Sequence, residues 1–424
     1  MTTVDLILRR ARLEQRDGIV DIAVEGGAIA AIAPRVPAEA PVELEAEGRL
    51  VSPAFVDPHI HLDKVEVFPL LPPNRTGTLS EAIELLHRTK RAASVEEIAA
   101  RAGAVIRRAV AAGTTFIRTH VDVDTVGGLR PLEGVARARA EHADLCEIQI
   151  VAFPQEGIER DPGTEDLMRE AMERGADVVG GMPHWERTPD ASQRHVDVCL
   201  DLAVRHDADV DMHIDETDDP RSRTLEVLID ATESYGWGGR VAAGHVCAMA
   251  GWDDGYAADM VARAASAGVA LITNPCTNLL LQGRMDNEPR RRGLLRVKEA
   301  LAAGVVVGCG QDCVNDAFYP FGAADQLQVA LVLAHAAQLS TPSEIAAALR
   351  MVRHDAARIL RLERYGVAEG SQADLVVLDA EDLHEALRYQ VPRRWVIRRG
   401  RVAAETVTGR RLHREPMADA AADA

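Results

Sequence analysis

A long alternation of short apolar segments with amphipathic ones, from about residue 50 to residue 364, most constrains the fold. Stretches such as SVEEIAARAGAVIRRAVAAG, with apolar residues every three or four positions, predict helices between the short segments. The short segments predict eight strands: GRLVSPAFVDPHIHLD, TTFIRTHVDVD, CEIQIVAFPQEG, ADVVGGMPHWE, ADVDMHIDE, RVAAGHVCAM, GVALITNPCTN and GVVVGCGQDCVND. Eight such alternations are typical of a (β/α)8 TIM barrel, whereas an open doubly wound sheet usually has fewer strands. We therefore expect an α/β fold with a barrel over residues 53–364.

The two ends of the chain share a different pattern. Near the start, VDLILRRARL and GIVDIAVEGGAIAAIAP alternate apolar and polar residues around turn glycines. The pattern returns in ADLVVLD (373–379) and RRWVIRRGRVAAETV (393–407). We expect one small β-sandwich domain built from both termini, with residues 1–52 as its first part. Residues 365–424 would form its second part and a frayed C-terminal tail.

Composition limits the classes of partner. The 424 residues are 47% hydrophobic and 27% charged, which is typical of a globular protein and excludes a disordered one. The net charge of −18 argues against a nucleic-acid partner, which would need a basic face. There is no apolar run of about 18 residues, the N-terminus is charged too early for a signal peptide, and the six cysteines form no CxxC pair. We expect a cytoplasmic protein with a small-molecule partner, and neither nucleic acid nor membrane.

Histidine and acidic residues gather where the predicted strands end. His59 and His61 end the first strand, and their two-residue spacing places both on one face of it. Later strand ends carry further candidates: His213 and Glu216 on the fifth, His245 on the sixth and Asp312 on the eighth. The carboxyl ends of barrel strands meet at one face, so these side chains should form one site. Three histidines and an aspartate would suit one divalent metal, leaving His245, Glu216 and Gln155 for the substrate and for proton transfer.

Lesser candidates have structural explanations. His120 and His184 also lie at strand ends, where we expect them to support the ligands rather than bind the metal. Cys309 should pack in the core, and Cys313 should line the pocket.

Several longer strings resemble bacterial cytosine deaminase, of the amidohydrolase superfamily. They are PHIHLD, QIVAFPQEGI, GADVVGGMPH, HIDETDD, LLLQGRMD, RRGLLRVKEAL and DAFYPFG, and the similarity extends to QVPRRWVIRRGRV near the C-terminus. The resemblance implies a distorted (β/α)8 barrel that holds one Fe(II) or Zn(II) ion, and a homo-oligomer. By motif, the metal ligands would be His59, His61, His213 and Asp312. Binuclear members of the superfamily carry a bridging lysine at the end of strand four, where this chain has GGMPHWE, which favours one metal.

The resemblance also implies catalytic roles. Glu216 would shuttle protons, His245 would contact the metal-bound water, and Asp312 would take a proton from it. Metal-bound hydroxide would attack the ring carbon that carries the amino group, and ammonia would leave. Gln155 would form a hydrogen bond with the substrate ring.

The chain departs from the cytosine deaminase pattern around the pocket. The usual G-H-D-D is Gly310-Gln311-Asp312-Cys313 here, Phe318 replaces a tryptophan, and Lys64 replaces a threonine. HLDK is also seen in N-isopropylammelide amidohydrolase, a related enzyme. Lys64 would contact a substrate carbonyl or carboxylate, or would form an ion pair with Asp63 or Glu66. The expected substrate contacts are Gln155, Leu79, Cys313, Phe318 and Lys64.

Three functions follow in order of preference. The first is hydrolytic deamination of cytosine or a closely related amino-substituted azaheterocycle. The second is removal of an alkylamine from an ammelide-like triazine, or opening of a cyclic amide. The third is a barrel kept only for binding, which the complete catalytic set disfavours.

Overall fold

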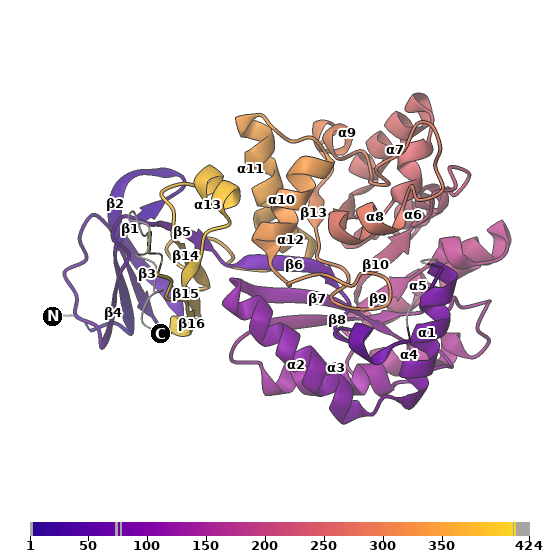
Figure 1. Ribbon diagram of the computed structural model, residues 1–424, viewed down its shortest axis with the longest axis horizontal. Coiled ribbons are helices and arrows are strands. Elements are labelled where there is room, and N and C mark those ends of the chain that lie inside the picture. The colour runs from indigo at the N-terminus through magenta and orange to yellow at the C-terminus, as the bar shows by residue number, and fades with distance from the viewer. Residues whose placement is uncertain (1–2, 73–74, 77–78, 410, 413–424) are drawn as a thin grey trace, which may run out of the picture.

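The computed structural model describes residues 3–72, 75–76, 79–409 and 411–412. A small sheet lies at one end of the molecule, and a larger unit of strands surrounded by helices forms the rest (Figure 1). The expected C-terminal tail, EPMADAAADA, lies outside the described residues. Among the helices of the described part, none is both long and apolar enough to cross a bilayer.

The larger unit contains an eight-stranded parallel sheet in sequential order. Its strands are β6 (Phe55–Ile60), β7 (Thr114–Asp122), β8 (Glu147–Phe153), β9 (Val178–Gly181), β10 (Asp209–Ile214), β11 (Val241–His245), β12 (Val269–Thr273) and β13 (Val307–Cys309). The last strand returns to the first through Asp312, whose backbone N–H donates to His59 O at 2.7 Å and whose carbonyl accepts from His61 N at 3.2 Å. The barrel is thereby closed just beyond β13. The predicted TIM barrel is confirmed, and each of the eight predicted segments contains one barrel strand. The first segment also contains β5 (Leu50–Pro53), which belongs to the small sheet instead.

Helices follow most of the strands and cover the outside of the barrel (Figure 1). They are α1 (Leu79–Ala92), α2 (Val95–Ala111), α3 (Arg130–Glu141), α4 (Thr164–Glu173), α5 (Pro189–His206), α6 (Thr224–Tyr235), α7 (Asp254–Ala267), α8 (Pro275–Leu281), α9 (Val297–Ala302), α10 (Gln326–Ala336), α11 (Pro342–Met351) and α12 (His354–Ile359). Helix α2 shows how the sequence sets these elements. Ser94 and Glu97 form a capping box at its start, and Ile98, Ala102 and Val105 bury one face.

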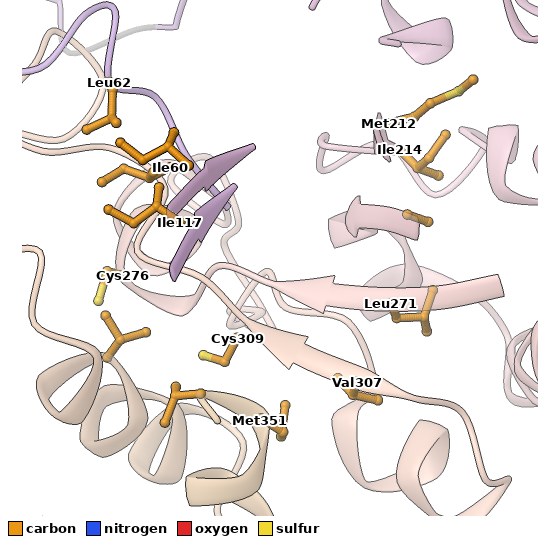
Figure 2. Close-up of a cluster of buried hydrophobic side chains, with 14 of the residues drawn as sticks. Ile60, Leu62, Ile117, Met212, Ile214, Leu271, Cys276, Val307, Cys309 and Met351 are labelled. Atoms are coloured by element: carbon orange, nitrogen blue, oxygen red, sulfur yellow. The ribbon is translucent and has the colours of Figure 1, made fainter. Parts of the chain in front are cut away.

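Period-two alternation separates the two faces of the barrel strands. Ile60 of β6 and Met212 and Ile214 of β10 belong to the apolar core between strands and helices (Figure 2). The residues between them, such as His59 and His213, therefore lie on the opposite, inner face. Cys309 is buried in the same apolar core, as the sequence suggested. The alternation thus directs polar side chains to the centre of the barrel.

The small domain joins both ends of the chain in one sheet, as predicted. The order is β16-β15-β14-β5-β1-β2-β3, with β4 paired to β1. Its strands are β1 (Leu6–Leu13), β2 (Arg16–Glu25), β3 (Ala28–Ala33), β4 (Val42–Glu45), β5 (Leu50–Pro53), β14 (Leu375–Leu378), β15 (Arg393–Arg398) and β16 (Arg401–Glu405), and α13 (Leu383–Tyr389) lies between β14 and β15. Strands β5 and β14 pair antiparallel. Only Ala54 separates β5 from β6, so the small domain leads directly into the first barrel strand.

Candidate metal centre and active site

The structure brings the predicted histidines and Asp312 together at the carboxyl ends of the strands. His61 Nε2 lies 3.2 Å from His213 Nε2 and 3.3 Å from Asp312 Oδ1. His59 Nε2 lies 3.6 Å from the same carboxylate oxygen. All four side chains are buried. Residues from β6, β10 and the end of β13 thus converge on one point inside the barrel.

The donor atoms of this cluster fit a divalent metal. Both ring nitrogens of His59, Nδ1 of His213 and Oδ2 of Asp312 are buried and make no hydrogen bond within the described part of the protein. Ligand atoms of His59, His213, His245 and Asp312 all lie within 4.8 Å of one another. Burial and the neighbouring histidines lower the pKa of His59 and His213 well below 6.5, so these imidazoles are neutral. Neutral imidazoles beside a carboxylate are a typical Zn(II) or Fe(II) donor set, and a cation would satisfy the unpaired atoms.

Glycine permits the close approach of the strands that carry the cluster. A Cβ at Gly310 would lie 2.7 Å from both Asn274 Oδ1 and the His59 Cβ, and a Cβ at Gly244 would lie 3.2 Å from the His59 ring. The backbone then turns through the left-handed region at His245, with φ of 70°, and at Asp312, with φ of 66°. Non-glycine residues in that region often occur at functional sites. Local geometry thus explains the Gly-His and Gly-Gln-Asp sequences.

His245 and Glu216 are two titratable side chains that lie next to each other beside the candidate ligands. His245 Nδ1 lies 3.2 Å from Glu216 Oε1 and 4.0 Å from Asp312 Oδ2. Burial lowers the pKa of His245 to about 4, so its ring is neutral near pH 7. Burial and the charge of Asp312 raise the pKa of Glu216 well above 4.5, so this carboxyl tends to keep its proton. A neutral carboxylic acid can donate a proton to a bound substrate.

Glu216 also lines a cavity of about 870 Å³. Other walls come from the segments that follow β9 and β10, including Met182, His184, Ser222 and Thr224. A cavity of this size can hold a small heterocycle next to the acid.

Sequence reasoning missed three side chains that hold this pair. Asn278 Nδ2 lies 3.0 Å from His245 Nδ1, and Asn274 Nδ2 lies 3.2 Å from His245 Nε2. Asp215 is fully buried and accepts four hydrogen bonds, from Ser222 Oγ, Thr224 N, Thr224 Oγ1 and Leu225 N. Both asparagines lie at the end of the seventh predicted segment, GVALITNPCTN, and this position near a strand end was the one available sign. Nothing in the sequence links Asp215 to a partner nine residues away.

Two further histidines contact the candidate ligands. His120 is fully buried, with its ring centroid 4.0 Å from that of His59, and its Nε2 lies 3.5 Å from Asp211 Oδ1. His184 Nδ1 lies 3.2 Å from the carbonyl oxygen of His213. Both therefore pack against candidate ligands, and His184 also lines the cavity.

Lys64 forms a different ion pair from those the sequence suggested. Its Nζ lies 2.6 Å from Asp122 Oδ1 and donates to Gln155 Oε1 at 3.0 Å. Glu66 instead accepts hydrogen bonds from Arg108 and Asn315. Asp122 ends β7, a strand whose contact with Lys64 no local pattern could reveal.

The remaining expected substrate contacts are placed as follows. Cys313 is buried, with Sγ 3.8 Å from Asp312 Oδ1. Phe318 is half-buried, and its backbone N–H donates to Asp316 Oδ1 at 2.9 Å. Leu79 begins α1, but its side chain lies outside the described part of the chain.

The barrel and its strand-end donors define a hydrolase that acts on carbon–nitrogen bonds, and the chain belongs to the amidohydrolase family, whose sequence profile matches residues 43–404. A crystal structure of 5-methylcytosine deaminase from Klebsiella pneumoniae, liganded with 5-fluorocytosine, superimposes with a TM-score of 0.92. It is 38% identical and covers 96% of this chain and 99% of its own. N-isopropylammelide isopropyl amidohydrolase of Pseudomonas sp. (strain ADP) is 32% identical over 94% of this chain and 96% of its own. Pterin deaminase of Rhizobium rhizogenes is 32% identical over 90% of this chain and 87% of its own. The superfamily inferred from the motifs is thus confirmed.

Proposed function

We propose that the protein is a metal-dependent hydrolytic deaminase of cytosine or a closely related amino-substituted azaheterocycle. The observation that carries the proposal is the placement of Glu216. Its side chain is 15% exposed and lines a cavity, its Oε1 lies 3.2 Å from His245 Nδ1, and its raised pKa keeps it protonated. The similarity to 5-methylcytosine deaminase over nearly the whole chain supports the substrate class.

His59, His61, His213 and Asp312 would hold one Fe(II) or Zn(II) ion. Their unpaired buried nitrogen and oxygen atoms support this donor set. When bound, a divalent metal would lower the pKa of its water to near 7 and so supply a nucleophile at neutral pH. The end of β9 and the segment after it, Gly-Gly-Met-Pro-His-Trp-Glu, offer no lysine for a bridged second ion, which supports one metal per chain.

The chain's own residues would supply the proton transfers. Glu216 donates its carboxyl proton to the ring nitrogen next to the amino-bearing carbon, which makes that carbon more electrophilic. Asp312 accepts the proton of the attacking water, and His245 stabilises the oxygen that becomes charged during attack. Gln155 binds the ring. Return of a proton to the amino group then releases ammonia.

Substitution of Glu216 tests the proposal. Glu216→Gln should reduce kcat by ~10²–10⁴-fold, because the amide cannot supply the proton, while the metal content stays at that of the wild type. The measurement is ammonia release from cytosine, isocytosine, 5-methylcytosine, creatinine and ammelide, after reconstitution with Fe(II) or Zn(II). Glu233→Gln, at an exposed position on α6, is the matched control. Full activity of Glu216→Gln would refute the mechanism.

A second function, removal of an alkylamine from an ammelide-like ring, is favoured by Lys64 within HLDK and by the similarity to N-isopropylammelide isopropyl amidohydrolase. Product analysis separates the candidates, because N-isopropylammelide would release isopropylamine rather than ammonia, and a cyclic amide would give a ring-opened acid. A strong preference for cytosine would count against this function.

A further inference from the structure

Two of the chain's three lysines lie together beside the candidate active site, Lys64 buried and Lys90 with its side chain 10% exposed. We call this group the lysine cluster; it consists of Lys64, Lys90, Asp122, Asp124 and Glu156. Lys64 Nζ lies 2.6 Å from Asp122 Oδ1, and Lys90 Nζ lies 2.6 Å from both Asp122 Oδ2 and Asp124 Oδ2. Glu156 Oε1 lies 3.8 Å from Lys90 Nζ. One carboxylate, Asp122, thus binds both lysines.

Four segments build the lysine cluster. Lys64 follows β6, Asp122 and Asp124 end β7 and its loop, Glu156 follows β8, and Lys90 comes from α1. Strands β6, β7 and β8 are neighbours in the barrel (Figure 1). Burial disfavours the charged form of both lysines, but attraction to Asp122 outweighs it and raises the pKa of each above its usual value. Lys64 is therefore a permanent hydrogen-bond donor.

This permanent donor fixes the side-chain amide of Gln155. An ammonium group only donates, so the Gln155 atom that lies 3.0 Å from Lys64 Nζ must be the carbonyl oxygen. The amide nitrogen then lies on the other side, 3.4 Å from Met182 Sδ. Gln155 is half-buried, and Met182 lines the same cavity as Glu216. A glutamine without such a partner could present its oxygen and nitrogen to a ligand in either order.

We propose that Lys64 is a positioning residue that locks the Gln155 amide in one orientation, and that Asp122 and Lys90 hold Lys64 in place for this task. The inference rests on the proposed function, in which Gln155 binds the substrate ring. The lock makes the site selective for the order of donor and acceptor groups along the edge of the ring. Lys64 would therefore set specificity without touching the substrate.

Cytosine and isocytosine are a matched pair of probes for this order. In cytosine, the ring N–H lies beyond the carbonyl as seen from the amino-bearing carbon. In the amide tautomer of isocytosine, the ring N–H lies between the amino-bearing carbon and the carbonyl carbon. A locked amide can match only one order, and a mismatched hydrogen bond at a buried group costs about tenfold or more. An unlocked amide can rotate to suit either ring.

The experiment compares the two rings in a double-mutant cycle. The ratio of kcat/KM and the ratio of Kd from isothermal titration calorimetry are measured for the wild type, Lys64→Met, Gln155→Met and the double variant. Lys64→Met should shrink the discrimination about tenfold in the wild-type background and leave it unchanged in the Gln155→Met background. Lys298→Met is the matched control, because Lys298 is 46% exposed and pairs with Glu344 on the surface.

Several results would overturn the inference. An unchanged ratio in Lys64→Met would do so, and so would an equal loss of affinity in both backgrounds, which would assign Lys64 to direct substrate contact. If neither ring is turned over, the proposed function fails, and the Kd ratios still decide whether the amide is locked. If neither ring binds, both proposals fail. Should Lys64→Met not fold, Lys90→Met replaces it and should shift the ratio in the same direction, with Lys90→Arg restoring it.

Discussion

Asp215 offers a sharp test of how the active-site loop is held. It lies directly before Glu216, at φ of 48°, and its Oδ1 accepts from Ser222 Oγ at 2.6 Å and from Thr224 N at 2.8 Å. Its Oδ2 accepts from Leu225 N at 3.0 Å. Thr224 and Leu225 are the first two residues of α6, so Asp215 satisfies backbone N–H groups that a helix start leaves unpaired. We predict that Asp215→Ala destabilises the barrel and disorders Glu216.

The size of the effect follows from the contacts. Two buried backbone donors lose their acceptor, at about 1–3 kcal/mol each. Loss of a negative charge at the start of a helix adds about 0.3–1 kcal/mol. Because the contacts share one carboxylate, and water can enter the space, the sum is an upper limit. We expect Asp215→Ala to cost ~3–5 kcal/mol and Asp215→Asn, which keeps one acceptor, ~1–3 kcal/mol.

Urea denaturation followed by tryptophan fluorescence measures this loss, since Trp252 Nε1 donates to Ser222 O in the same loop. Asp219→Ala is the matched control. Asp219 is in this loop too, but its side chain is 43% exposed and pairs with its near neighbour Arg221, so its loss should cost less than about 1 kcal/mol. A cost below about 1 kcal/mol for Asp215→Ala, or equal costs for both variants, would refute the reasoning.

Three further predictions concern the barrel. Arg118→Met should cost ~3–5 kcal/mol in urea denaturation because the buried Asp211 loses its arginine partner, whereas Arg137→Met, at a 50% exposed position, should cost under about 1 kcal/mol; equal costs would contradict this. Removal of the metal by a chelator should lower the thermal midpoint of unfolding. A divalent metal added at ~1,000 times its Kd should then raise the free energy of unfolding by ~4 kcal/mol, so a midpoint that does not respond to metal would argue against the site. Burial lowers the pKa of His195, so folded His195 stays neutral while the unfolded chain binds a proton below about pH 6.5. Stability should therefore fall as pH drops, by up to about 1.4 kcal/mol per pH unit from this residue, and His195→Asn should flatten that part of the profile of urea midpoint against pH.

The sequence was sufficient for the architecture because the signals involved are local. Each barrel strand is a short apolar segment between helical patterns, and the family motifs mark the strand ends that carry His59, His61 and His213. The joining of the two termini was predictable because both ends show the same alternating pattern. The pattern did not identify the strands that make the junction, because β5, which pairs with β14, lies in a segment that the sequence assigned to the first barrel strand.

Contacts between distant segments were not predictable from one sequence. Lys64 and Asp122 are 58 residues apart, and Lys90 reaches Asp124 from a helix outside the barrel. The local reasoning offered Asp63 and Glu66 as partners of Lys64, because they are its neighbours in the chain. Lys64 pairs with Asp122 instead, because β6 and β7 are adjacent strands whose ends meet. The same limit applies to Asp215, whose partners are set by the path of a loop.

Local sequence patterns and contacts between distant segments correspond to two levels of function, the reaction class and the choice of substrate. Reaction class depends on side chains fixed by strand ends, since a barrel directs each of those ends to the same point. In the proposed function, substrate choice depends on Gln155, and we propose that its orientation is set by Lys64 and, through Asp122, by Lys90 on α1. A substitution in α1 can therefore alter which ring is accepted without moving a catalytic group. If reaction class and substrate choice are separated in this way, the lysine cluster, rather than the metal motif, is where the substrate specificity of this chain should be tested.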